Sequence, residues 1–231
     1  MTEDGVDFDR RPPMPVGEYE TTVRQVNIGY DLMFTLTHCF LRALHRDNLD
    51  LLVVGAGGGA EIERLLPLNP GWRLTGVDPS ADMLALARAK AERVGVADRV
   101  ELLQGRVEDL PESPRFDAAV CIFVLHFLSD TEKLSVLRST KQRLLGEAPA
   151  ILVTASAGDD DGLGDDMLGA WQQYGESMGM PAEQMAGTIQ RLATLPRTAE
   201  SDYERLIREA GFARVACFFS VLTGVTGWIA R

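Results

Sequence analysis

A glycine-rich turn between two apolar runs constrains the fold of this chain more than any other feature. The run Leu51–Val54 leads into three closely spaced glycines, and a second apolar run ends at Asp78. The glycines are Gly55, Gly57 and Gly59. Glycines let a backbone turn tightly into a helix and approach a ligand, and an acid about 20 residues further on can accept hydrogen bonds from ribose hydroxyls. This order predicts a βαβ unit that holds a nucleoside.

Strand and helix patterns alternate along the rest of the chain. Apolar runs predict strands at residues 50–54, 72–77, 99–104, 116–124 and 150–155. Helical spacing of apolar residues predicts helices at 60–66, 81–94, 131–145 and 201–210. Two further β-runs, 214–222 and 225–230, indicate a closing hairpin. The pattern predicts an α/β fold with a Rossmann-like, doubly wound, seven-stranded sheet, mostly parallel and closed by an antiparallel hairpin.

Segments outside this core define the domain organisation. Residues 1–18 are charged and proline-rich and are predicted to form a flexible tail, while 19–231 form a single domain. Within that domain, 19–48 are expected to form N-terminal cover helices, and 157–197 a helical lid between strands five and six. The lid carries Met167, Trp171 and Tyr174, side chains that can wrap an apolar acceptor. An added helical layer or a homodimer contact is the alternative use of the lid.

The charge and composition of the chain limit the kinds of binding partner that we expect. The net charge is −11, from 23 basic and 34 acidic side chains, and such a field repels phosphate backbones, so nucleic acid is a disfavoured partner. No apolar stretch has the length of a membrane span, and the start lacks the order of a secretory signal. We expect a cytoplasmic protein with no membrane partner. The three cysteines (Cys39, Cys121, Cys217) form no CxxC pair and are expected to be buried, with no metal site.

Four motifs in order over residues 50–128 resemble the class I S-adenosylmethionine-dependent methyltransferases, in particular small-molecule types such as methyltransferase type 12 and the carboxy-S-adenosylmethionine synthases. The motifs are Gly55-Ala-Gly57-Gly-Gly59, Val77-Asp78-Pro-Ser80, Gly105-Arg-Val-Glu-Asp109-Leu-Pro111, and Phe116-Asp-Ala-Ala-Val120 leading to Leu125-His126. The resemblance implies transfer of a methyl group from S-adenosyl-L-methionine to an oxygen or nitrogen of a small-molecule acceptor, with release of S-adenosyl-L-homocysteine.

The resemblance also implies a set of cofactor-binding residues. The glycine turn would pass under the methionine and ribose, and Asp78 would bind both ribose hydroxyls. Met83 would pack on the adenine, whose edge would be read by the Val107 N–H and by Glu108. Cys121 and Phe123 would flank the methionine portion. The full predicted set is Arg24, Tyr30, Gly55, Ala56, Gly57, Gly59, Asp78, Pro79, Met83, Arg106, Val107, Glu108, Cys121 and Phe123.

The chain departs from the family pattern at two positions. Many relatives carry an acid two residues before the first glycine, where this chain has Val53. The usual aspartate of the third motif is replaced by Arg106, which cannot accept a hydrogen bond from an adenine amino group. Either Glu108 or Asp109 takes that task, or the adenine is held by backbone and packing. A non-catalytic cofactor-binding protein is therefore an open alternative.

The predicted catalytic residues are His126 and Tyr30. The segment from Arg24 to Tyr30 resembles one that covers the cofactor in small methyltransferases, so Arg24 would pair with the cofactor carboxylate and Tyr30 would line the pocket. His126 lies near the expected acceptor and can take a proton from a nucleophile. A structural role is its alternative. The predicted acceptor-contacting residues are His126, Met167, Trp171 and Tyr174.

Other functions share parts of this pattern. A carboxy-S-adenosylmethionine synthase-like enzyme would modify the cofactor itself, and a tRNA-modifying relative would act on nucleic acid. An NAD-dependent dehydrogenase could use the same glycines and Asp78, but the third and fourth motifs are not expected there, and the chain has no Tyr-x-x-x-Lys pair.

Overall fold

The computed structural model describes residue 9 and residues 16–113, 115–157, 164–193, 198–221 and 224–231. The tail predicted at residues 1–18 falls mostly outside the described residues, as do parts of the predicted lid segment 157–197. Within the described part, strands and helices alternate as the sequence pattern predicts.

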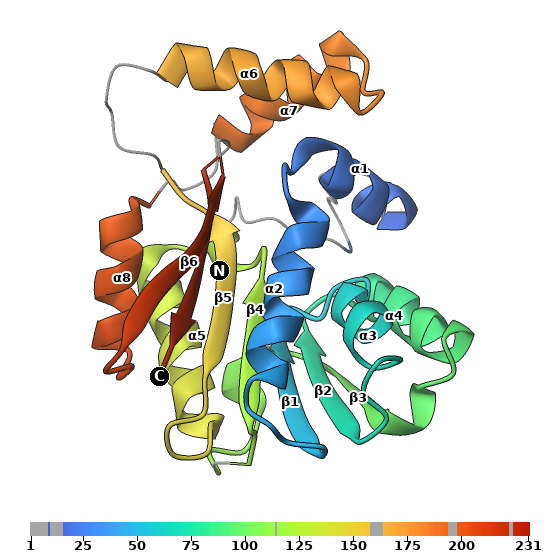
Figure 1. The fold of residues 1–231 in the computed structure, drawn as a ribbon, viewed down its shortest axis with the longest axis vertical. Coiled ribbons are helices and arrows are strands. Elements are labelled where there is room, and N and C mark those ends of the chain that lie inside the picture. The colour runs from blue at the N-terminus through green and yellow to red at the C-terminus, as the bar shows by residue number, and fades with distance from the viewer. Residues whose placement is uncertain (1–8, 10–15, 114, 158–163, 194–197, 222–223) are drawn as a thin grey trace.

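One seven-stranded sheet organises the chain, with the order β3-β2-β1-β4-β5-β7-β6 (Figure 1). The strands are β1 Leu49–Val54, β2 Trp72–Asp78, β3 Val100–Gln104, β4 Ala118–Ile122, β5 Ala150–Ala155, β6 Val215–Val221 and β7 Val225–Ala230. Strands β1 to β5 pair in parallel, whereas β7 pairs antiparallel with both β5 and β6. The predicted doubly wound sheet with an antiparallel closing hairpin is confirmed.

Helices cover both faces of the sheet and leave a separate pair at one end. They are α1 Tyr19–Val26, α2 Tyr30–Arg42, α3 Ala60–Leu65, α4 Ala81–Arg93, α5 Asp130–Arg143, α6 Gly164–Ser177, α7 Ala182–Ala193 and α8 Glu200–Glu209. Residues on alternate sides of β1 feed two cores: Leu51 and Val53 pack with α2, α3 and α4, and Leu52 and Val54 pack with α5 and α8.

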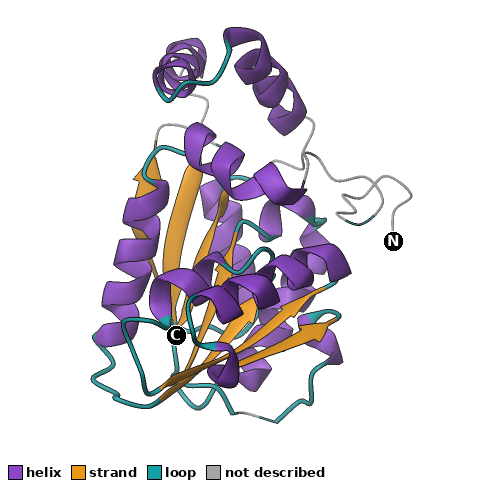
Figure 2. Cartoon of the chain, turned by 90° about the vertical axis from the view of Figure 1, so that its right-hand side faces the viewer, coloured by secondary structure: helices purple, strands orange, loops and turns teal. Residues whose placement is uncertain are grey.

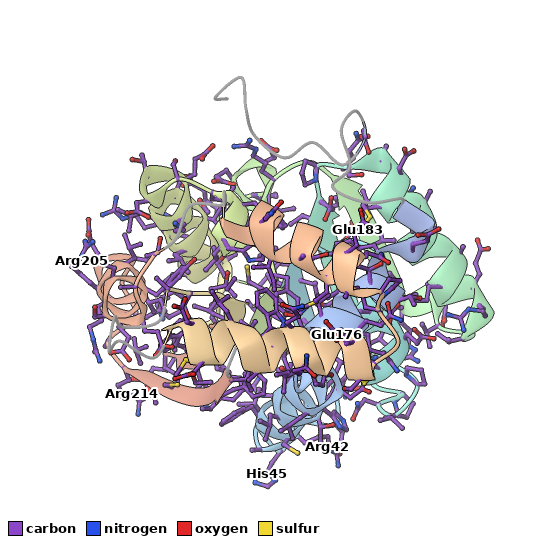
Figure 3. All side chains as sticks on the ribbon, turned by 90° about the horizontal axis from the view of Figure 1, so that it is seen from above. Arg42, His45, Glu176, Glu183, Arg205 and Arg214 are labelled. Carbon is purple, nitrogen blue, oxygen red and sulfur yellow. The ribbon has the colours of Figure 1, made fainter. Side chains whose placement is uncertain are left out.

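The helices α6 and α7 stand beyond the end of the sheet at which β5 finishes (Figures 1 and 2). They cross over that end when the molecule is viewed from above, with Glu176 on α6 and Glu183 on α7 (Figure 3). Their own small core unites Trp171, Met180 and Met185 with Val26 of α1. Within the described part of the predicted helical lid, 157–197, there are therefore two helices, separated where Gly179 and Pro181 interrupt the helical pattern.

Local signals account for several element ends. Gly29, at φ 78°, separates α1 from α2. The Ser80 hydroxyl accepts a hydrogen bond from the Met83 N–H at 3.1 Å and caps α4. Gly211, at φ 103°, follows α8 as a C-terminal glycine. Each of these ends thus depends on a glycine or a capping side chain next to it in the chain.

The expectation for the cysteines is correct for one residue and wrong for two. Cys121 is buried in the central strand β4, but Cys39 and Cys217 are exposed. Cys39 lies on the outer side of α2, and Cys217 lies on β6, an edge strand with a half-solvated face. An apolar run on a half-covered element thus does not guarantee burial. No helix among the described residues has the length and apolar character needed to cross a membrane.

Candidate functional site

The glycine turn after β1 is held tightly against β2. The N–H groups of Gly55 and Ala56 both donate to the Val77 carbonyl oxygen, at 2.8 and 3.0 Å. Gly55 has φ 72°, and a Cβ there would lie 2.1 Å from Cγ2 of Val124. A side chain at Gly55 would therefore be both strained and overpacked, and the turn depends on glycine at this position.

Asp78 ends β2 beside this turn, with its side chain almost fully buried. Its Oδ2 accepts a hydrogen bond from the Gly57 N–H at 2.8 Å, and its Oδ1 accepts one from the Ser80 N–H at 2.9 Å. Burial raises the pKa of the Asp78 carboxyl, while the two N–H donors oppose that rise. Because each carboxylate oxygen has two lone pairs, the group can still accept two further hydrogen bonds.

The start of α4 completes this part of the site. The Met83 side chain is buried, and its Cε lies 3.3 Å from where a Gly57 Cβ would be. Asp9, from the N-terminal segment, accepts hydrogen bonds from the Ser80 hydroxyl and from the Ala81 N–H, the latter at 3.1 Å. No local sequence pattern indicates the contact of Asp9 with Ser80, because it joins residues far apart in the chain.

The third motif forms a short 3₁₀ helix, Val107–Asp109, after β3. The Arg106 N–H donates to the Asp109 carboxylate at 2.8 Å, so Asp109 stabilises the turn itself. Glu108 accepts a hydrogen bond on Oε1 from the Ser135 hydroxyl at 3.0 Å, and its Oε2 is buried without a partner among the described residues. Of the two acids, Glu108 retains the unused acceptor.

An aromatic row lies along the end of β4. The Tyr30 and Phe123 rings stack with centroids 6.5 Å apart and planes 6° apart, and the His126 ring meets Phe123 edge-on at 6.1 Å. Phe123 has φ 58°, a left-handed conformation that is costly for a bulky residue. The chain thus turns sharply after β4 and leaves this row at the carboxyl-terminal edge of the sheet.

The His126 ring is buried and its hydrogen bonds fix its tautomer. The Thr154 hydroxyl accepts from the His126 backbone N–H at 3.1 Å, which leaves its own proton to donate to Nδ1, also at 3.1 Å. The Ala155 N–H points at the same Nδ1 from 3.4 Å. Nδ1 is therefore an acceptor and Nε2 carries the proton. Burial, followed by the charge of Lys133, lowers the pKa of His126 to about 3.

Two other predicted site residues stay protonated. Burial, reinforced by the charges of Glu20 and Glu61, raises the pKa of the Tyr30 phenol far above its usual range. Burial, together with Glu61, raises the pKa of the Cys121 thiol to about 12. Tyr30 can thus donate a hydrogen bond, and Cys121 is not a thiolate nucleophile.

Two arginines flank Tyr30, one predicted and one missed. Arg24 lies 5.7 Å from the centroid of the Tyr30 ring and pairs with Asp31 at 3.1 Å. Arg64, which the sequence analysis did not single out, lies 5.2 Å from the same centroid and pairs with Asp31 at 2.9 Å. Only the three-dimensional arrangement of α2 and α3 brings Arg64 to this place.

The predicted acceptor residues on α6 differ in surroundings. Trp171 is only 7% exposed, and its indole N–H donates to the Val26 carbonyl oxygen at 2.6 Å, which ties α6 to α1. Met167 is 40% exposed, and Tyr174 is half-buried. Trp171 thus belongs to a small core, whereas Met167 offers apolar surface.

Glu61, in the first turn of α3, is a buried acid that the sequence analysis missed. Burial raises the pKa of its carboxyl to about 7. An acid two residues after the last glycine of the turn is the signal that could have identified it. Among the described residues, no group of three or more histidine, cysteine or acidic side chains could hold a metal ion.

Comparison with known proteins identifies relatives of this fold. A family model described as a methyltransferase domain matches residues 52–147. The carboxy-S-adenosyl-L-methionine synthase of Wolinella succinogenes is 30% identical over 162 residues, which are 69% of this chain and 65% of that enzyme. The ubiquinone/menaquinone biosynthesis C-methyltransferase UbiE of Agrobacterium fabrum is 25% identical over 87% of this chain and 81% of its own length.

Solved structures share the architecture. A structure described as a putative O-methyltransferase from Nostoc punctiforme superposes with a TM-score of 0.65 at 20% identity, covering 98% of this chain and 63% of its own. Magnesium protoporphyrin IX methyltransferase from Synechocystis, with S-adenosylhomocysteine bound, gives a TM-score of 0.64 at 15% identity. The match covers 93% of this chain and 92% of that structure's chain. This chain spans 23% of a Synechococcus relative and 65% of the Wolinella enzyme, so it corresponds to part of those proteins.

Proposed function

We propose that the chain is a class I S-adenosylmethionine-dependent methyltransferase and that it transfers a methyl group from S-adenosylmethionine to an oxygen or nitrogen of a small-molecule acceptor. The observation that carries the proposal is the position of Asp78. Its buried carboxylate, at the carboxyl end of β2, accepts hydrogen bonds from the Gly57 and Ser80 N–H groups and can still accept further hydrogen bonds. Two ribose hydroxyls are donors that this geometry suits.

The residues around Asp78 fit the cofactor. The missing side chain of Gly57 leaves the backbone open beside Asp78, and the buried Met83 offers an apolar side chain at the same turn. Phe123 and Cys121 lie at the end of β4, where we assign the methionine portion. Arg24 remains our proposed partner of the cofactor carboxylate, because its ion pair with the 60%-exposed Asp31 is a weak surface interaction that can exchange.

We assign the adenine amino group to Glu108. Asp109 already accepts the Arg106 N–H, whereas the buried Oε2 of Glu108 has no partner among the described residues. The Val107 N–H, adjacent in the same short helix, is the proposed donor to the adenine ring. This arrangement explains how the chain can read adenine although Arg106 replaces the usual aspartate.

The proposed mechanism relies on positioning. When bound, S-adenosylmethionine supplies an activated methyl group on a sulfonium, which an acceptor heteroatom displaces in line. The residues of this chain bind and orient: Asp78 fixes the ribose, the Tyr30–Phe123 pair forms an apolar wall, and the α6–α7 pair stands over the site to exclude water. Tyr30 stays a protonated phenol and can donate a hydrogen bond to a bound ligand.

We propose that His126 orients the acceptor through its Nε2–H and does not act as a free base. Nδ1 is engaged by Thr154 and Ala155, and the pKa of about 3 keeps the ring neutral at physiological pH. A His126→Asn variant should therefore bind S-adenosylhomocysteine normally and turn over more slowly. With S-adenosylmethionine saturating at every pH, the turnover number of the wild type should show no inflection near pH 6.5, where an unperturbed histidine titrates; an inflection there would restore the general-base role.

A second candidate is chemistry on the cofactor itself, as the name of the Wolinella relative indicates. Such a reaction needs cationic side chains to hold an additional carboxylate, and Arg24 and Arg64 both lie over Tyr30. Arg24 is already assigned to the carboxylate of the cofactor, and Arg64 is paired with Glu20 and Asp31, which favours methyl transfer. The product distinguishes the two: a carboxylated cofactor has a larger mass, whereas methyl transfer yields S-adenosylhomocysteine.

The experiment that tests the proposal is incubation of the purified protein with methyl-labelled S-adenosylmethionine and panels of phenols, carboxylic acids and amines. Label in an acceptor together with stoichiometric S-adenosylhomocysteine supports it. Tight cofactor binding with no product from any panel would favour a non-catalytic binding protein.

A further inference from the structure

Glu61 is the most deeply buried acid of the described residues that the proposed mechanism does not use. Its side chain is 5% exposed, although it lies in the first turn of a helix at the edge of the site. Among the described residues, its carboxylate has one hydrogen-bond donor, its own backbone N–H. A buried carboxylate normally has a cation or several donors, since burying an uncompensated charge is costly.

No cation of the described chain pairs with Glu61. The two positive side chains that act on it are Arg64 and Lys90, and both are already paired with more exposed acids. Arg64 lies 3.6 Å from Glu20 and 2.9 Å from Asp31, and Lys90 pairs with Glu20 and, at 3.4 Å, with Glu63. The nearby cations thus pair with acids that are more exposed than Glu61, while Glu61 itself has no cationic partner among the described residues.

The surroundings of Glu61 place it between the ribose end and the β4 end of the site. The negative charge of Glu61 helps to raise the pKa of the Tyr19 and Tyr30 phenols and of the Cys121 thiol. The charge of Asp78 also helps to raise the pKa of Tyr19. The groups that surround it on the packed elements are Tyr19 and Glu20 of α1, Tyr30 of α2, Arg64 of α3, Lys90 of α4 and Cys121 of β4. Because Val54 pairs with Cys121 in the sheet, the glycine turn that leads into α3 and Glu61 lies beside the Cys121 end of the site.

We propose that the Glu61 carboxylate is the counter-ion of the α-ammonium group of S-adenosylmethionine, an assignment that rests on the proposed function. S-adenosylmethionine carries its ammonium on the methionine portion, which the site assigns to the Cys121 end. The acid that many relatives carry before the first glycine is Val53 here. Glu61 supplies a buried carboxylate from the other side of the same turn.

The buried carboxyl makes binding depend on pH. Free Glu61 has a pKa of about 7, so at pH 6 it is mostly protonated, and an ammonium ion requires its ionised form. Binding at pH 6 should therefore release about one proton, and affinity should fall about tenfold for each pH unit below the pKa. Ligands without an ammonium group should show neither effect.

The test is a calorimetric titration with two ligands, S-adenosylhomocysteine and 5′-methylthioadenosine, which keeps the nucleoside but lacks the amino-acid portion. Glu61→Gln should weaken S-adenosylhomocysteine roughly 10- to 100-fold, the range for losing a charge-assisted contact, and leave 5′-methylthioadenosine unchanged. Titrations at pH 6 in buffers of different ionisation enthalpy should lose the proton release in this variant. Glu63→Gln, on the same helix but partly exposed and paired with Lys90 and Arg93, is the matched control and should keep both affinities.

The outcomes of these titrations separate the role of Glu61 from the proposed function. Equal affinities of Glu61→Gln and wild type for S-adenosylhomocysteine, or proton release that persists in the variant, would overturn the role of Glu61 and leave the proposed function standing. Failure of the wild type to bind either ligand would overturn the proposed function instead. If Glu61→Gln does not fold, the wild type alone still tests the idea: pH-independent affinity for S-adenosylhomocysteine between pH 5.5 and 8 would contradict it.

Discussion

The two ends of the site are built in different ways. At the cofactor end, Asp78, the glycine turn and Ser80 are joined by backbone hydrogen bonds of 2.8 to 3.0 Å, directly on the central strands of the sheet. At the acceptor end, α6 and α7 contact the remainder mainly through Trp171 and a small core on α1. One end is part of the main core, and the other has a core of its own.

The difference separates what is general in this fold from what is particular to this chain. In the proposed site, a nucleoside would be held by backbone groups and one carboxylate, which require glycines and an acid at set positions. The proposed acceptor end presents exposed side chains such as Met167 on helices that few contacts anchor, so its sequence is less constrained. Mutations at the two ends should therefore have separable effects on cofactor binding and on the acceptor.

The largest effect is expected from Gly55→Ala at the cofactor end. The added Cβ would meet Val124 at a backbone position of φ 72°, so strain and overpacking together should lower the free energy of unfolding by about 4 kcal/mol. Gly58→Ala is the matched control, because its Cβ would make ordinary contacts at 3.9 and 4.0 Å. Urea denaturation compares the two, and equal stabilities would mean that the turn is not held as described.

The next effect concerns the buried charge. Glu61 has a folded-state pKa of about 7 against 4.5, so its favourable contribution is complete below pH 4.5 and is lost as pH rises through 7. From pH 4.5 to 8 the wild type should lose about 3 kcal/mol of unfolding free energy relative to Glu61→Gln. Glu63→Gln should show a smaller difference of opposite sign, because ion pairing lowers the pKa of Glu63. Parallel pH profiles of wild type and Glu61→Gln would contradict the burial of this charge.

A smaller and more local effect is expected at the acceptor end. Trp171→Phe removes the hydrogen bond to the Val26 carbonyl, which should cost about 1 kcal/mol. Amide hydrogen exchange should become faster in α1 and α6 and stay unchanged in β1 and β4. Affinity for S-adenosylhomocysteine should not change; a loss comparable to that of a cofactor-end variant would show that the two ends are coupled.

The smallest change should follow Met167→Ala. This side chain is exposed, so stability should change by less than about 0.5 kcal/mol. If the α6–α7 pair contacts the acceptor, KM for the acceptor should rise while cofactor affinity stays constant. An unchanged KM would assign Met167 to surface that the acceptor does not touch.

The sequence allowed the cofactor end to be predicted more completely than the acceptor end. The alternation of strands and helices in the core and the position of Asp78 at the end of β2 follow from local patterns, because each depends on residues close in the chain. The roles of Glu61 and Arg64 could not be read in that way, since they depend on how α1, α2 and α3 pack against one another. Trp171 was predicted to contact the acceptor, but its burial against Val26 arises from a contact between distant segments.

The measurement that tests the central claim most directly is calorimetric titration of the wild type and Asp78→Ala with S-adenosylhomocysteine, with NAD as a parallel ligand. The wild type should bind S-adenosylhomocysteine and not NAD, and Asp78→Ala should bind it about 1.5–3 kcal/mol more weakly, as expected for losing charge-assisted hydrogen bonds. Asp82→Ala, at an exposed acid in the first turn of α4, should bind like the wild type. Unchanged affinity in Asp78→Ala, or binding of NAD in place of S-adenosylhomocysteine, would contradict the account.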